Sequence, residues 1–306
     1  MVLAVLATAA VPAAAEARTN VRVGIADQNA AMFGAPKYRS LKLKITRYFI
    51  RWDARNVPGD IAAADNFVRT ARKRHIKVLM HISTNTFVEK AAHLPSLSEY
   101  RRYVGYLVRH YRKLGVRDWG SWNEMNHKTQ PTYKSPKRAA QYFKTMRRLC
   151  KGCKIVSLDI LDQAGATSYI RRYFKALGSY RRHATVVGIH NYSDTNRLSH
   201  HGRGTKAIIR AVKRYSHRRP QFWLTETGGV VKFGRSFPCN EKRQARAVGN
   251  MFRLARSNRR DIKRLYVYNW TGSDCSTRFD TGLTRANGKV RPAYSTFKSR
   301  LRSFKR

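Results

Sequence analysis

Two glutamates are the residues whose positions most directly suggest chemistry. The chain carries 63 Lys and Arg but only 17 Asp and Glu, and six of these acids are Glu. Glu124 and Glu226 each follow a short, aromatic, uncharged segment, Trp119–Asn123 and Phe222–Thr225 respectively. Two carboxyl groups that face each other across a pocket suit glycoside hydrolysis, in which one protonates the leaving oxygen while the other attacks the sugar carbon or activates water. The alternative, that each carboxylate simply pairs with an arginine, explains one such position better than two.

These glutamates need a scaffold that brings distant segments together. Short apolar segments alternate with longer amphipathic ones, which is the pattern of parallel strands alternating with helices. The expected strands are Val21–Ala26, Ile45–Trp52, Val78–Ile82, Trp119–Asn123, Ile155–Leu161, Val186–Asn191, Phe222–Thr225 and Leu265–Trp270. This pattern predicts one α/β domain, a (β/α)8 TIM barrel over residues 18–306, although periodicity does not exclude an open, doubly wound sheet. In a barrel, both glutamates lie at the carboxyl ends of strands, where active sites form.

Local signals indicate where helices begin. Ser96 and Glu99 have the spacing of a capping box. Pro136 and Asn240 have the residue types of a first helical position and an N-cap. The last helix is expected over Pro292–Phe304. These signals fall between the expected strands, as the alternating pattern requires.

The two glutamate segments resemble motifs of the clan A glycoside hydrolases, which are retaining enzymes built on a (β/α)8 barrel. The sequence W-N-E-M-N at 122–126 resembles the W-N-E-P-N motif of the clan, with Met125 in place of the usual Pro. Leu224-Thr225-Glu226 resembles the strand of the nucleophile. The resemblance, closest to families 5 and 39, implies that Glu124 is the acid/base and Glu226 the nucleophile. It also implies that Asn123 binds the 2-hydroxyl of the sugar that is cleaved.

Other segments extend the resemblance along the chain. His190-Asn191-Tyr192 resembles the His-x-Tyr of the clan, which makes His190 a site residue and lets Tyr192 orient the nucleophile. Arg47 resembles the second-strand arginine that pairs with the nucleophile, and Arg51 competes with it for the inward position. His81, at the end of the third expected strand, is a weaker match.

Two tryptophans are expected to line the sugar site. Trp270 resembles the aromatic floor of the clan's sugar site, and Trp122 adjoins the expected acid/base. Both are expected to stack on sugar rings. Apolar walls of this kind, together with the charge of Glu226, are also expected to raise the pKa of Glu124.

The cysteines favour structural disulfides. Cys150 and Cys153 are close enough in sequence for a local bridge, which leaves Cys239 to pair with Cys275 across the loops after the last two strands. The alternative for the C-x-x-C sequence is a redox-active pair or half of a zinc site. A second C-x-x-C is missing, so we expect no metal, and the proposed chemistry needs no cofactor.

Residues 1–17 form an apolar segment that closes in A-E-A, which is typical of a secretory signal peptide, although no basic stretch precedes it. A membrane anchor is the alternative, but the segment is shorter than the roughly 20 residues a spanning helix needs. We therefore expect an exported, extracellular protein without stable membrane insertion.

The net charge of +46 is the most unusual feature of the composition. It favours contact with polyanions, whereas the 42% hydrophobic content excludes a disordered or fibrous chain. The first hypothesis is a secreted retaining glycosidase acting on a poly- or oligosaccharide, with acidic and cell-wall glycans as the candidate substrates. The second is a non-catalytic carbohydrate- or polyanion-binding protein on the same barrel. Nucleic acid is not expected as a partner, because the chain contains no recognised nucleic-acid-binding module.

Overall fold

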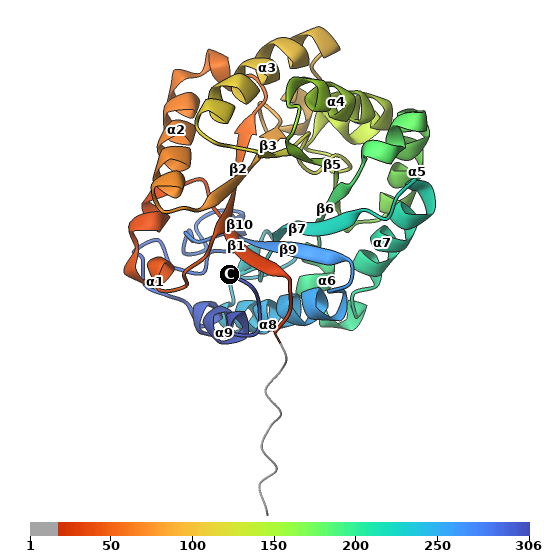
Figure 1. Ribbon diagram of the computed structural model, residues 1–306. Coiled ribbons are helices and arrows are strands. Elements are labelled where there is room, and N and C mark those ends of the chain that lie inside the picture. The colour runs from red at the N-terminus through yellow and green to blue at the C-terminus, as the bar shows by residue number, and fades with distance from the viewer. Residues whose placement is uncertain (1–17) are drawn as a thin grey trace, which may run out of the picture.

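A computed structural model describes residues 18–306 and contains a closed barrel of eight parallel strands (Figure 1). The expected signal peptide, residues 1–17, lies outside the described residues. The barrel strands are β1 (Arg22–Ala26), β2 (Ile45–Arg51), β3 (Lys77–Ser83), β4 (Asp118–Gly120), β5 (Lys154–Leu161), β6 (Val186–His190), β7 (Gln221–Thr227) and β9 (Ile262–Tyr268). Each strand pairs with the next, and β9 pairs with β1 to close the ring. The predicted barrel is confirmed, and the open sheet is excluded.

Helices surround the barrel, and each longer helix covers the outside of neighbouring strands (Figure 1). They are α1 (Pro36–Arg39), α2 (Pro58–Lys73), α3 (Leu97–Lys113), α4 (Pro136–Leu149), α5 (Ala166–Leu177), α6 (Tyr192–Asn196), α7 (Arg203–Tyr215), α8 (Glu241–Ser257) and α9 (Pro292–Leu301). The capping box forms as expected, because the Ser96 hydroxyl accepts from the Glu99 N–H and the Glu99 carboxylate accepts from the Ser96 N–H. The last helix ends at Leu301, three residues before the expected Phe304.

Two apolar layers hold the barrel together. The smaller one fills the barrel interior and consists of Ala26, Ile45, Leu79, Val156, Val186, Trp223 and Tyr266, with Tyr268 packed on it. The larger one lies between the strands and the helices. Because side chains alternate along a strand, β2 sends Ile45 and Arg47 inward while Tyr48 and Ile50 join the outer layer.

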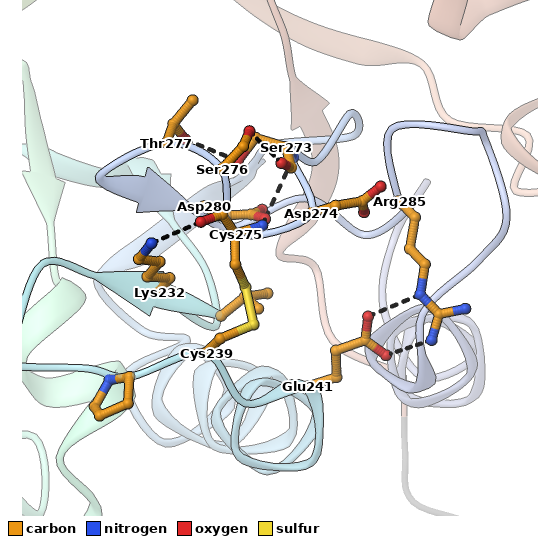
Figure 2. Close-up of a disulfide and its surroundings, with 12 residues drawn as sticks. Lys232, Cys239, Glu241, Ser273, Asp274, Cys275, Ser276, Thr277, Asp280 and Arg285 are labelled. Carbon is orange, nitrogen blue, oxygen red and sulfur yellow. Dashed lines mark hydrogen bonds and ion pairs between the residues drawn. A yellow bond between two sulfur atoms is a disulfide. The ribbon is translucent and has the colours of Figure 1, made fainter.

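Both predicted disulfides form, Cys150–Cys153 and Cys239–Cys275. The second joins the segment after β8 (Lys232–Phe233) to the loop before β10 (Phe279–Asp280), and Figure 2 shows Lys232 and Asp280 beside it. β8 and β10 pair as a small antiparallel sheet at the mouth of the barrel. Within residues 18–306, no helix has the length and apolar character needed to cross a bilayer.

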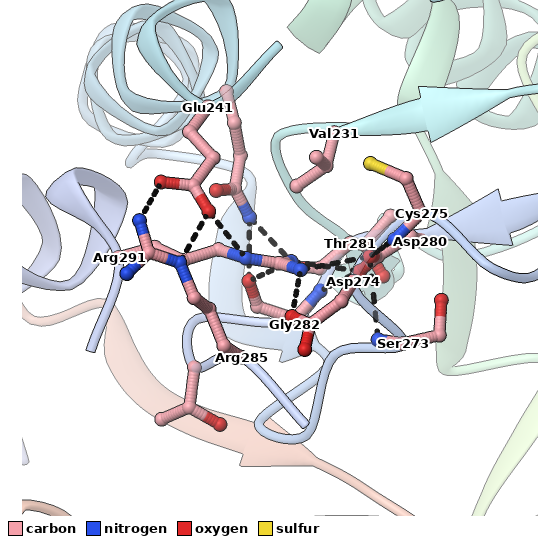
Figure 3. A network of polar contacts seen from close by, with 12 residues as sticks. Val231, Glu241, Ser273, Asp274, Cys275, Asp280, Thr281, Gly282, Arg285 and Arg291 are labelled. Carbon is pink, nitrogen blue, oxygen red and sulfur yellow. Dashed lines mark hydrogen bonds and ion pairs between the residues drawn. The ribbon is translucent and has the colours of Figure 1, made fainter. Parts of the chain in front are cut away.

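A buried ion pair anchors the same rim. The Arg291 guanidinium, 1% exposed, donates to both carboxylate oxygens of Asp280 at 2.8 Å (Figure 3). Glu241 lies 3.2 Å from the Arg291 Nε and also accepts two hydrogen bonds from Arg285. Because a buried charge is stable only when it is paired, this network fixes β10 against the start of the last helix.

Candidate active site

Glu124 projects from a tight turn beyond β4. That strand ends at Gly120, so Glu124 lies four residues farther along the chain than the end of the strand. Its backbone has a φ of 41°, which a non-glycine residue rarely adopts. Backbone bonds on both sides hold the turn, from the Asn123 N–H to the Ile82 carbonyl and from the Met125 N–H to the Asp159 carbonyl. The turn therefore directs the Glu124 carboxylate over the barrel mouth.

Glu226 lies within β7 rather than after it, and two neighbours hold its carboxylate in place. The Arg47 Nη1 donates to Oε2 at 2.7 Å, and the Tyr192 hydroxyl donates to Oε1 at 2.9 Å. Arg47 also donates from Nη2 to the Asn123 side-chain oxygen and from Nε to His81 Nδ1. Arg47 is fully buried, so it is Arg47, not Arg51, that takes the inward position on β2. Arg51 pairs instead with Asp53 at 2.6 Å.

One imidazole joins the two glutamates. His190 Nδ1 lies 3.0 Å from Glu124 Oε1 and 3.8 Å from Glu226 Oε2. Since both distances start at the same nitrogen, these two oxygens are at most about 7 Å apart. Retaining glycosidases keep their carboxyl groups about 5–5.5 Å apart, and inverting ones about 6.5–9.5 Å. The geometry thus brings together residues from five strands and the turns that follow them, namely Arg47, His81, Asn123, Glu124, His190, Tyr192 and Glu226.

A buried aspartate beneath the glutamates was missed by the sequence analysis. Asp159 is fully buried on β5, with its carboxylate 2.9 Å from His190 Nε2 and 3.6 Å from His81 Nε2. It also accepts a hydrogen bond from the Thr225 hydroxyl. The available signal was a single charged residue in the otherwise uncharged sequence I-V-S-L-D-I-L. A charge in the middle of a buried strand requires a partner, and here the partner is His190.

The charges of this cluster determine which group carries a proton. Burial alone would lower the pKa of His190, but the charges of Asp159 and Glu226 raise it to about 10. His190 has a carboxylate beside each ring nitrogen, so both nitrogens carry hydrogen in the resting site. Burial lowers the pKa of His81 to about 3, and its Nδ1 accepts from Arg47, so His81 is neutral.

The expected rise in the pKa of Glu124 is wrong for the free protein. Burial does act to raise it, but the hydrogen bond and charge of His190 outweigh burial and lower the pKa below the ordinary value. The pKa of Asp159 is likewise lowered, because the positive charge of His190 outweighs the effect of burial. Within residues 18–306, no group of three or more His, Cys, Asp or Glu side chains is arranged to hold a metal ion.

The two tryptophans expected to contact sugar do not line the site. Trp122 is fully buried, donates from Nε1 to Gln130 and stacks on Tyr142 with ring centroids 5.0 Å apart. Its indole therefore faces the helical layer. Trp270 is 5% exposed and packs edge to face against Tyr38 and Tyr294.

Tyr268 takes the place that Trp270 was expected to fill. β9 ends at Tyr268, two residues earlier than the predicted strand end, and the chain leaves the barrel before it reaches Trp270. Tyr268 is partly exposed, and its pKa is raised by burial and by the charge of Glu226. An aromatic ring thus lies beside the candidate nucleophile, but a different one from the ring predicted.

We predict that Gly188→Ala disrupts the cluster. A Cβ at Gly188 would lie 1.9 Å from Asp159 Oδ1 and 2.5 Å from the Thr225 hydroxyl oxygen, so Asp159 must move. Urea denaturation should show a loss of about 1–3 kcal/mol in the free energy of unfolding. Gly249→Ala is the matched control, since its Cβ would meet only Thr296 at 3.7 Å on a helix, where Ala is favoured over Gly. Equal stability of the two variants would contradict the assigned packing.

We also predict that the stabilising effect of His190 fades at alkaline pH. Its pKa of about 10 in the folded protein exceeds the ordinary histidine pKa of 6.5, so its contribution is complete below about pH 6.5 and is lost as the pH rises through 10. The difference in unfolding free energy between wild type and His190→Gln should be several kcal/mol at pH 6 and should shrink toward pH 10. Urea denaturation across this range measures it, with the exposed His217→Gln as control. A difference that does not vary with pH would disprove a protonated His190.

No protein-family model and no curated protein matches the chain. Solved structures do match it. A psychrophilic glycoside hydrolase family 10 endo-β-1,4-xylanase has 15% identity and a TM-score of 0.63, over 91% of this chain and 96% of that one. Xylanase 10B from Thermotoga maritima has 15% identity and a TM-score of 0.64, over 92% and 95%. A family 39 glycoside hydrolase from Bacteroides cellulosilyticus WH2 has 14% identity and a TM-score of 0.61, over 93% and 64%. The chain has the (β/α)8 fold of these clan A enzymes.

Proposed function

We propose that the protein is a retaining glycoside hydrolase that cleaves a poly- or oligosaccharide by double displacement. The observation that carries this proposal is the pair of carboxylates, Glu124 and Glu226, within reach of one nitrogen of His190 at the barrel mouth. The fold shared with family 10 and family 39 enzymes supports it. A barrel that only bound sugar would not need this buried, paired arrangement.

In the first step, the Glu226 carboxylate attacks the anomeric carbon. The hydrogen bonds from Arg47 and Tyr192 hold it in position for the attack. A carbon–oxygen bond to Glu226 forms while the bond to the leaving oxygen breaks, and Glu124 supplies the proton that the leaving oxygen needs. The side-chain oxygen of Asn123 is taken by Arg47, which leaves its amide nitrogen to donate to the 2-hydroxyl of the sugar.

The proton of this step is first held by His190. Glu124 has a lowered pKa in the free site, whereas His190 keeps its proton across neutral pH. When bound sugar displaces water from the mouth, ionised Glu124 becomes less favourable, because it loses solvent contact. The proton then moves along the 3.0 Å contact from His190 Nδ1 to Glu124 and on to the leaving oxygen.

In the second step, water attacks the anomeric carbon and the bond to Glu226 breaks. Glu124, now ionised, takes a proton from that water and returns it to His190, so the resting site is restored. The configuration of the sugar is kept, because two successive displacements invert it twice. Arg47 and Tyr192 then hold the free Glu226 carboxylate again.

We infer that the protein is exported and works outside the cell. The signal-like sequence of residues 1–17 and the two disulfides support this inference, because disulfides persist in oxidising compartments. The similar structures named above include an endo-β-1,4-xylanase and a second xylanase, so xylan is the first polymer to test. The panel of polysaccharides described next tests which sugar and linkage the protein cleaves.

Glu124→Gln and Glu226→Gln should each lower hydrolysis by about 10³-fold or more, because each removes one of the two carboxyl groups. Reducing-sugar release from xylan, glucan, mannan, polygalacturonate and bacterial cell-wall glycans measures the effect. Azide should partly restore the activity of Glu124→Ala and Glu226→Ala on aryl glycosides, with a retained product from the first and an inverted one from the second. Opposite products would exchange the two roles.

Glu89→Gln is the matched control for these variants, since Glu89 is exposed in the loop after β3. It should hydrolyse the substrate at the wild-type rate. Thermal unfolding of each variant tests that the fold remains. Full activity in both Glu124→Gln and Glu226→Gln would end the proposal and favour the alternative of a non-catalytic binding protein.

The charge supports a second proposal, that the protein binds anionic polymers. A groove beside α3 is lined by Arg109, Arg112, Lys113 and Arg117, and the net charge of the chain is +46. Affinity for polygalacturonate should fall at least about tenfold between 0.05 and 0.5 M NaCl, because exposed charges are screened over a shorter distance as salt rises. Titration calorimetry measures it. Binding that does not weaken with salt would contradict the proposal that the positive charge of the protein binds anionic polymers.

A further inference from the structure

A row of five aromatic rings crosses the mouth of the barrel. The ring centroids of Phe87 and Phe49 are 5.9 Å apart, and those of Phe49 and Tyr268 are 6.5 Å apart. The row continues from Tyr268 to Phe279 at 6.4 Å and from Phe279 to Phe233 at 5.6 Å. We call these five residues the aromatic band. Its rings come from β2, β9, β8, β10 and the loop after β3, which lie far apart in the sequence.

The middle of the band lies beside the candidate catalytic groups. Phe49 is two residues after Arg47 on β2, and Tyr268 is two residues after the interior residue Tyr266 on β9, so both point toward the barrel mouth. The Tyr192 ring, whose hydroxyl donates to Glu226, packs edge to face against Phe279 at 5.5 Å. The central rings therefore border the place where the bond is cleaved.

One end of the band is fixed to the rim. Phe279 pairs with Phe233 across the two-stranded sheet, which puts the two rings on one face. The neighbouring Asp280 points the other way, where Arg291 holds it (Figure 3). Lys232 donates to the Cys275 carbonyl, and the disulfide from Cys275 to Cys239 braces the same segment (Figure 2). The aromatic face is thus presented by a rim that is anchored from behind.

Both ends of the band are open to solvent. Phe87 is 49% exposed and Phe233 is 40% exposed. Within residues 18–306, only four large hydrophobic side chains are at least 40% exposed, and two of them are the ends of the band. Exposed aromatic side chains that continue from a binding site mark a surface for a ligand rather than part of the core. The band therefore extends the site in two directions.

Polar groups accompany the aromatic rings, as a sugar site requires. Phe49 and Phe87 line a hollow together with Gln28, Arg51, Asp60, Thr84 and Asn85. Apolar walls with a few convergent polar groups are the usual lining of a small-molecule site. The C–H face of a sugar ring packs on an aromatic ring, while its hydroxyl groups, at the edge, reach side chains of this kind.

We infer that the aromatic band binds several consecutive sugar rings of a polysaccharide, with sugars on both sides of the bond that is cleaved. The inference rests on the proposed function for the position of that bond. Successive ring centroids are 5.6–6.5 Å apart, so a chain of sugars that crosses the band meets several rings in turn. The substrate class is a polymer or a long oligosaccharide, and a single terminal sugar would use only the middle of the band.

The test is binding of the Glu226→Gln protein to insoluble xylan, cellulose, mannan, chitin and β-1,3-glucan, measured by depletion of protein from solution. About 0.5 M NaCl screens the exposed charges, so that retention reports the uncharged contacts. At least one polymer should retain the protein. Phe87→Ala and Phe233→Ala should each weaken that retention about fivefold or more, as expected when a contact ring is removed from a binding surface. Phe87→Tyr and Phe233→Tyr should restore it, because the ring is kept.

Val88→Ala and Leu198→Ala are the matched controls, since both remove an exposed hydrophobic side chain that is aliphatic. They should bind as the parent does. The inference would be overturned if none of the five polymers retained the protein, or if the control and band variants lost retention equally. Self-association through the band would appear as a dimer in sedimentation. Binding through the band without turnover by wild type would contradict the proposed function and leave the band in place. Turnover of short glycosides with no polymer binding would support the proposed function and contradict polymer binding by the band.

Discussion

The whole site depends on one buried imidazolium. His190 lies between Asp159 and Glu124 and within 4 Å of Glu226, so its positive charge compensates carboxylates that have little or no contact with water. Arg47 supplies the other positive charge in contact with Glu226. Burying an unpaired carboxylate is costly, and removing one partner leaves the others uncompensated. The carboxylates can therefore lie close together only because the positive charges of His190 and Arg47 compensate their negative charges.

The barrel has to leave space for this cluster, and two glycines provide it. A Cβ at Gly120 would lie 1.7 Å from the His81 ring, and one at Gly188 would lie 1.9 Å from the Asp159 carboxylate. Each glycine faces a polar side chain from the neighbouring strand, where any larger residue would close the space. Closure of the ring between β1 and β9 then sets the distances between strands. The packing of the barrel strands therefore determines the positions of the polar side chains in the site.

The sequence predicted the features that depend on local residue patterns. It did not predict where a strand ends or which way a side chain points, because these depend on the register between strands. The strands, the capping box and the Cys150–Cys153 disulfide follow from neighbouring residues, and Cys239–Cys275 is the pair that this local bridge leaves. The contact of Arg47 and Tyr192 with Glu226 follows the family resemblance. Trp122 and Trp270 were placed wrongly, because β4 and β9 end earlier than their apolar sequences suggest and both indoles turn to the helices. Asp159 was missed because the register of β5 shifts between Val156 and Leu158, which no alternation of residue types reveals.

The proposed proton path keeps the charge of the buried cluster constant. In the resting site, three carboxylates face the positive charges of Arg47 and His190. When Glu226 becomes an ester it loses its negative charge, and His190 has given up its proton in the same step, so the sum does not change. A route in which Glu124 held the proton from the start would need a carboxylic acid beside a charged imidazole, which the lowered pKa of Glu124 opposes. Because the pKa of Glu124 is lowered and that of His190 is raised, a cluster of this composition favours the route through His190.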